Sequence, residues 1–209
     1  MAKNHLFILS VIISFSAVSQ NDSSFVKNKL SFSVSPHHIL ELYHGPSINA
    51  GIEYAVTNHF SFYSECGHFI PNLLWSDYYD LKGFSFSQEF KAFYNDDNYI
   101  SFQVIYGKQE YWKEDSLTDG TMLYYDNKKE FLDLSFRYGK NMVFKNRLFI
   151  NPYIGLGIRT HRLNCSLAES VAASRLLGNW NNPKNWIHGP GSKTYLKAQL
   201  GIRIGFRIL

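Results

Sequence analysis

After its first twenty residues, the sequence lacks any apolar segment long enough to form a membrane-spanning helix. A bilayer requires about 20 consecutive apolar residues, and the later apolar stretches are shorter. Low-complexity tracts and clusters of one charge are also absent, because the formal net charge is only +4 and the charged residues are spread out. Nucleic-acid binding is therefore not predicted, since it relies on concentrated basic residues.

The amino-terminal residues read as a secretory signal spanning residues 1–19. Lys3 precedes the apolar run LFILSVIISFSAV, and Ala17 and Ser19 stand at the small-residue positions before a cleavage site. Residues 20–29 then form a short N-terminal segment before a single domain over 30–209.

Cysteine is scarce, with only two in the chain. Neither follows the predicted cleavage site directly, which argues against a lipoprotein. Cys66 and Cys165 would both lie in an oxidising compartment, where a disulfide can persist. They are therefore a candidate disulfide, and two separate thiols are the alternative.

Alternation with a period of two is abundant. The last stretch, TYLKAQLGIRIGFRIL, has apolar residues at every even position from Leu196 to Ile208 and mostly polar residues or glycine between them. Such a pattern predicts β-strands, because a helix would place its apolar residues three and four apart. The eight predicted strands cover residues 29–42, 46–56, 59–69, 83–94, 99–109, 130–140, 147–161 and 194–209.

The connections between these strands alternate between short and long. Three long loops are expected at residues 70–82, 110–129 and 162–193, all on one side of an up-and-down arrangement. Short periplasmic turns and longer outside loops are typical of outer-membrane barrels. The last loop is predicted to hold a short helix, which begins at a capping box of Ser166 and Glu169 and ends at Gly178.

Alternation alone allows two opposite barrels. A secreted lipocalin-like barrel would turn its apolar face inward and bind an apolar ligand, whereas a membrane barrel would turn that face outward. The glycine-rich polar face suits a narrow interior, and the apolar face carries no charge through the middle of each strand. Tyrosines near strand ends suit a membrane interface, and no lipocalin-like G-x-W is found near the first strand. These tyrosines are Tyr54, Tyr94, Tyr106 and Tyr138.

The sequence therefore predicts an all-β fold, an eight-stranded antiparallel up-and-down transmembrane β-barrel. Over residues 30–209 it resembles the small outer-membrane barrels of the OmpA transmembrane-domain or OmpX kind, through its strand count, loop asymmetry and closing strand. One departure is the last residue, Leu209, where such proteins usually carry an aromatic residue. The resemblance implies residence in the cell outer membrane, contact with outer-membrane lipid and with the barrel-assembly machinery, and no cofactor.

Two groups of residues are singled out for function. Charges in a narrow interior must pair, so the inward-facing ones predict a salt-bridged plug, with a gate in a small ion path as the alternative. The interior set is Glu53, Glu65, Glu89, Lys91, Asp133, Arg137, Arg159, Lys197, Arg203 and Arg207. Aromatic residues in the long loops suit contact with a surface protein or glycan, or packing over the barrel mouth. The loop set is Trp75, Tyr78, Tyr79, Trp112, Tyr124, Tyr125, Trp180 and Trp186.

An enzymatic reading starts from His59-Phe60-Ser61, which resembles the His-x-Ser of outer-membrane lipid A deacylases. In the expected topology this pair lies on the turn side, whereas such a hydrolase works at the outer leaflet. No metal site is expected, because the adjacent His37 and His38 point to opposite faces. The predicted role is therefore non-enzymatic, either structural or one of surface contact through the long loops.

Overall fold

The structure is a computed structural model that describes residues 30–35, 47–70, 79–95, 97–116, 122–144, 147–166 and 191–208. The predicted signal peptide, the N-terminal segment and residues 167–178 of the predicted helix lie outside these ranges. Within them, no helix is long and apolar enough to cross a membrane.

The regular structure in the described residues consists of nine β-strands. They are β1 (Leu30–Ser35), β2 (Ser47–Ala55), β3 (Phe60–Phe69), β4 (Tyr79–Phe93), β5 (Asn98–Ser116), β6 (Met122–Lys140), β7 (Met142–Phe144), β8 (Leu148–Cys165) and β9 (Gly191–Ile208).

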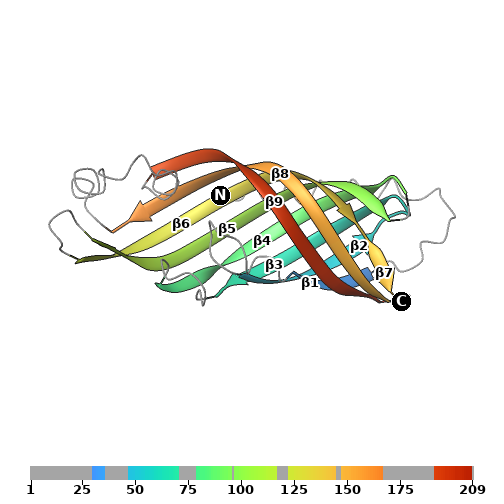
Figure 1. Cartoon of the computed structure of the whole chain (residues 1–209), viewed down its shortest axis with the longest axis horizontal. Coiled ribbons are helices and arrows are strands. Elements are labelled where there is room, and N and C mark those ends of the chain that lie inside the picture. Colours follow the sequence, from blue (N-terminus) through green and yellow to red (C-terminus); the bar gives the residue numbers. More distant parts are fainter. Residues whose placement is uncertain are drawn as a thin grey trace, which may run out of the picture.

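Eight of these strands form a closed antiparallel ring. Neighbours along the chain pair from β1 to β6, β6 pairs with β8, β8 pairs with β9, and β9 returns to β1 with Ile208 opposite Leu30. The strands run obliquely to the long axis of the molecule (Figure 1). The predicted all-β, antiparallel, eight-strand arrangement is confirmed, and the ring is compatible with a β-barrel.

The two ends of the ring are named here by their connections. The loop side is the end where β3 leads to β4, β5 to β6 and β8 to β9. The turn side is the opposite end, where β2 leads to β3 and β4 to β5. β7 lies on the turn side and pairs only with β8, through Phe144 opposite Leu148. The short connection expected between the predicted strands 130–140 and 147–161 therefore contains a short strand of its own.

Side chains alternate between the two faces of the ring, with apolar ones outside. Phe136 is 72% exposed and Leu200 is 81% exposed, whereas the inward-facing Gln103 is 1% exposed. The outward apolar residues are here called the apolar belt. They occupy the even-numbered positions within residues 30–34, 48–54, 60–66, 84–94, 100–106, 132–138, 148–158 and 196–208. Two polar residues interrupt the belt, and they bond to each other: Gln88 Nε2 donates to Ser64 Oγ at 2.8 Å.

On the loop side, this polarity reverses. The outward position after Tyr106 on β5 is Lys108, which pairs at 2.7 Å with Glu130 on β6. The interior at that level contains an apolar cluster, formed by Phe69, Leu81, Ile105, Tyr111, Phe131 and Leu163. Buried polar side chains lie there as well, from Gln109, Asn127, Lys129 and His161. The ring therefore continues past the apolar belt as a wall with charged residues on its outer face and both apolar and polar side chains inside, called here the loop-side extension.

This extension corrects the predicted loop at residues 110–129. Residues 110–116 and 122–129 are strand, so β5 and β6 form a long hairpin. The sequence criterion assumed that outward positions stay apolar. That assumption fails from Lys108 onward, where the strands continue with charged residues at their outward positions. β4 likewise begins at Tyr79, before its predicted start.

One irregularity shapes the start of β4. The register with β5 shifts between Tyr79 and Lys82, and Gly83 adopts φ 146°. A Cβ at Gly83 would collide with the carbonyl oxygen of Lys108, so only glycine fits the close approach of these strands.

Candidate functional site

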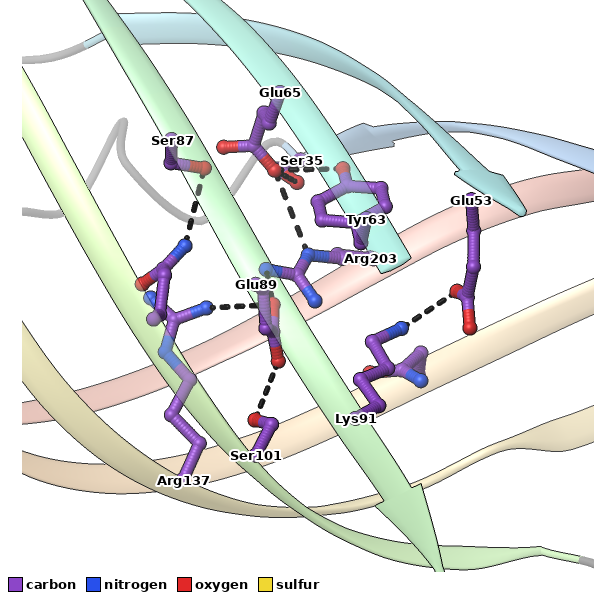
Figure 2. Close-up of polar contacts among 12 residues, drawn as sticks. Ser35, Glu53, Tyr63, Glu65, Ser87, Glu89, Lys91, Ser101, Arg137 and Arg203 are labelled. Atoms are coloured by element: carbon purple, nitrogen blue, oxygen red, sulfur yellow. Dashed lines mark hydrogen bonds and ion pairs between the residues drawn. The ribbon is translucent and has the colours of Figure 1, made fainter. Parts of the chain in front are cut away.

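The middle of the ring interior holds four charged side chains from four strands, here called the central ion cluster: Glu65, Glu89, Arg137 and Arg203. Arg203 on β9 lies 2.6 Å from Glu89 on β4 and 3.5 Å from Glu65 on β3 (Figure 2). Arg137 on β6 approaches Glu89 at 3.4 Å. All four are nearly inaccessible to solvent, so their charges balance inside the protein, two against two.

Both carboxylates also accept hydrogen bonds from uncharged donors. Glu65 accepts hydrogen bonds from Ser35 Oγ at 2.9 Å, Asn49 Nδ2 at 2.7 Å and Tyr63 OH at 2.6 Å. Glu89 accepts one from Ser101 Oγ at 2.6 Å. A buried carboxylate is stable only with such partners, because its desolvation is costly.

Aromatic rings hold the guanidinium groups of this cluster. The Arg203 guanidinium carbon lies 4.1 Å from the centre of the Tyr63 ring and 4.9 Å from that of Tyr153. Arg137 lies 4.2 Å from the same Tyr153 ring. These cation–π contacts help to hold the two arginines beside the carboxylates.

A second ion pair lies on the turn side of the cluster. Lys91 Nζ donates to Glu53 Oε2 at 2.6 Å and sits over the rings of Tyr63 and Tyr99, at 5.1 and 4.9 Å. The hydroxyl of Ser61 also donates to Glu53, at 2.6 Å. The serine singled out for nucleophilic chemistry is therefore buried and engaged by a carboxylate.

A third group lies toward the loop side. Asp133 on β6 accepts two hydrogen bonds from Arg159 on β8 and a further one from Lys197 Nζ at 3.1 Å. The Arg159 guanidinium carbon stands 4.6 Å from the centre of the Phe131 ring. The interior thus contains three charged groups along its length, each with oppositely charged residues in contact.

Nine of the ten interior residues expected from the sequence take part in these groups. The tenth, Arg207, lies half buried near the end of β9 and makes no ion pair with another residue in the described part of the chain.

Sequence reasoning missed the rings that fill the interior beside these charges. In three cases a ring lies over a glycine directly opposite it on the next strand, and in one case over a glycine on the diagonal. The pairs are Tyr99 with Gly139, Phe131 with Gly107, Phe149 with Gly205 and, diagonally, Tyr63 with Gly51. The sequence did contain a signal for them. These aromatic residues stand at odd-numbered positions, like the polar residues of their strands, and therefore face the same side of the sheet.

Filling one of these glycine positions should destabilise the ring. Replacing Gly139 with valine would drive its side chain into the ring of Tyr99, which is fully buried. We expect the free energy of unfolding to fall by about 1–3 kcal/mol, the usual cost of overpacking a filled interior. Urea titration of the folded protein measures it. The double variant Gly139→Val with Tyr99→Leu should recover part of the loss, and no recovery would contradict the proposed clash.

The loop contact candidates are only partly described. Trp112 and Tyr124 stand on the outer face of the β5–β6 hairpin with ring centres 5.9 Å apart, and Tyr124 is 62% exposed. Tyr125 points inward and is buried, which agrees with the packing alternative for this residue and not with surface contact. The side chains of Trp75, Tyr78, Tyr79, Trp180 and Trp186 lie outside the described part.

The candidate disulfide is not formed. Cys66 faces outward on β3 in the apolar belt, and Cys165 lies at the loop-side end of β8, a strand that does not neighbour β3. Within the described ranges, no group of three or more His, Cys, Asp or Glu residues is placed to hold a metal ion.

The chain was also compared with known proteins. No family model matches it, and the comparison found no matching curated protein and no matching solved structure.

Proposed function

We propose that the protein is an outer-membrane β-barrel, non-enzymatic, with a closed charged interior and a structural or surface-contact role. The observation that carries this proposal is the polarity of the ring, which has an apolar outer belt without a charge and paired charges inside. Water would disfavour such an exterior, whereas the hydrocarbon of a bilayer would match it.

The dimensions of the belt support the proposal. On β5 every outward-facing residue between Asn98 and Lys108 is apolar, so the outer face carries no charge over residues 99–107. A tilted transmembrane strand needs about 9–11 residues, which agrees with that length. Tyr106 on the loop side and Tyr138 on the turn side mark the edges, as amphipathic rings at a membrane interface would.

The interior supports a closed barrel rather than a channel. Ion pairs and rings pack the middle of the ring, and eight strands leave no room for an aqueous channel of porin size. The same packing disfavours a lipocalin-like barrel, because ion pairs and aromatic rings occupy the described interior at the level of the belt. A lipid A hydrolase built on Ser61 is disfavoured because its hydroxyl is bonded to Glu53.

A contact role is supported by the loop-side extension. It raises the β5–β6 hairpin beyond the belt, with ion pairs such as Lys128 to Glu110 at 3.3 Å on its outer face. Trp112 and Tyr124 form an exposed aromatic pair among these charges. Rings of this kind suit contact with a surface protein or a glycan.

Gel mobility tests the proposal directly. We expect the protein in the purified outer-membrane fraction, with a band that migrates differently before and after boiling, because a closed strand ring in a membrane resists detergent at ambient temperature. A soluble protein whose mobility is unchanged by heating would refute the assignment and turn the search toward a bound ligand.

A further inference from the structure

The outer face of the ring carries an apolar groove of about 900 Å³. It crosses five adjacent strands, β4, β5, β6, β8 and β9, between two rows of outward side chains that are in register. One row runs through Phe136, Leu156 and Ala198, and the next, nearer the turn side, runs through Tyr138 and Ile154.

Small and large side chains create this groove. On β9 the outward neighbours of Ala198 are Leu196 and Leu200, which are 85% and 81% exposed and stand out from the wall. Phe136 and Leu156 project similarly, at 72% and 70%. The small Ala198 therefore forms the floor of the groove between larger, projecting side chains. The lining of the groove is almost entirely apolar.

Polar groups gather at the turn-side edge of the groove. Tyr94 OH donates to Tyr138 OH at 3.2 Å, and Tyr138 OH donates to Asn98 Oδ1 at 3.4 Å. Lys140 is the next outward residue after Tyr138 on β6, opposite Asn98, and it is exposed.

We propose that this groove binds one glycerophospholipid from the turn-side leaflet. An acyl chain would lie between the two apolar rows, and the phosphate would meet the Lys140 ammonium and the tyrosine hydroxyls at the edge. An apolar groove alone would take any hydrocarbon, but the cation and hydroxyls at one end select a chain that carries an anionic head. The inference rests on the proposed membrane location.

Native mass spectrometry of the full chain, folded in a mild detergent, tests the site. The probe is a phosphatidylglycerol with two oleoyl chains, added in increasing amounts. We expect one lipid to remain bound. Filling the floor with Ala198→Phe should weaken lipid binding by about tenfold or more, because the new phenyl ring would occupy the space of the acyl chain.

Two matched variants separate the parts of the site. Ala50→Phe makes the same change on the outer face of β2, away from the groove, and should leave binding within about twofold of the original. Lys140→Gln should weaken phosphatidylglycerol by about tenfold, the effect of one lost charge-assisted contact, while binding of an uncharged dioleoylglycerol changes little.

Equal losses in Ala198→Phe and Ala50→Phe, or no retained lipid in the original protein, would overturn the groove. The heat-dependent gel shift is recorded on the same samples. A shift without lipid retention rejects the groove alone, whereas a protein without the shift rejects the membrane barrel and the groove together.

Discussion

Replacing Arg203 with methionine is expected to lower the free energy of unfolding by about 3–5 kcal/mol, the cost of breaking a buried ion pair from one side. Arg203 is the cation closest to Glu89, and it also contacts Glu65. Methionine retains much of the side-chain length but leaves the two carboxylates facing each other with one guanidinium fewer. Their remaining neutral donors cannot balance both charges in an interior that water does not reach.

The measurement is urea unfolding of the protein folded in lipid vesicles, followed by tryptophan fluorescence. Arg162→Met is the matched control, because Arg162 faces outward on β8 opposite Glu130 in the exposed extension. Exposed ion pairs contribute about 0–1 kcal/mol, so this variant should unfold almost like the original protein. A similar small loss for Arg203→Met would mean that the central ion cluster is not a unit of stability.

A companion variant identifies the cause of that loss. Adding Glu89→Gln to Arg203→Met removes one of the stranded carboxylates while keeping its shape. If an uncompensated buried charge is the main cause of the lost stability, the double variant should be more stable than Arg203→Met alone. If lost packing against Tyr63 and Tyr153 dominates instead, the second change should bring no recovery.

Placing a charge on the apolar belt should have the second large effect. Ile202 is the middle one of the outward apolar positions of β9, between Leu196 and Ile208, and it is 45% exposed. Ile202→Arg should reduce the free energy of unfolding in a bilayer by about 2–4 kcal/mol, because arginine would lie near the midplane of the hydrocarbon. We expect less protein in the outer-membrane fraction and a weaker heat-dependent gel shift.

The control for this experiment is Ser192→Arg. Ser192 lies on the same strand and the same outer face, but on the loop side of the belt, next to the charged Arg162 of β8. An arginine there should cost about 0–1 kcal/mol because it stays near water. If both variants assemble equally well, Ile202 does not face lipid and the proposed membrane orientation is wrong.

These two experiments examine opposite faces of the same strand. Arg203 and Ile202 are consecutive on β9, yet one meets carboxylates and the other is exposed on the outer wall. Each experiment therefore tests one half of the proposal, the first the paired interior and the second the apolar exterior.

The sequence by itself determined the strands of the belt and the face on which each side chain lies. That information is local, because consecutive residues of a strand point to opposite faces whatever the strand pairs with. Residues such as Glu89, Lys91 and Arg137 could therefore be placed inside before any partner was known. The same parity rule applied to Tyr99 and Tyr153 would also have placed those rings inside.

The partners themselves were decided only by the tertiary structure. Arg203 reaches Glu89 because closure of the ring brings β9 across from β4, and that position depends on the stagger of every pairing between them. The loop-side extension was hidden for a related reason. From Lys108 onward the outward positions carry charged rather than apolar side chains, so the strand continues where the apolar signal in the sequence ends. The local pattern records the face of each residue, whereas the register of distant strands sets which charges meet.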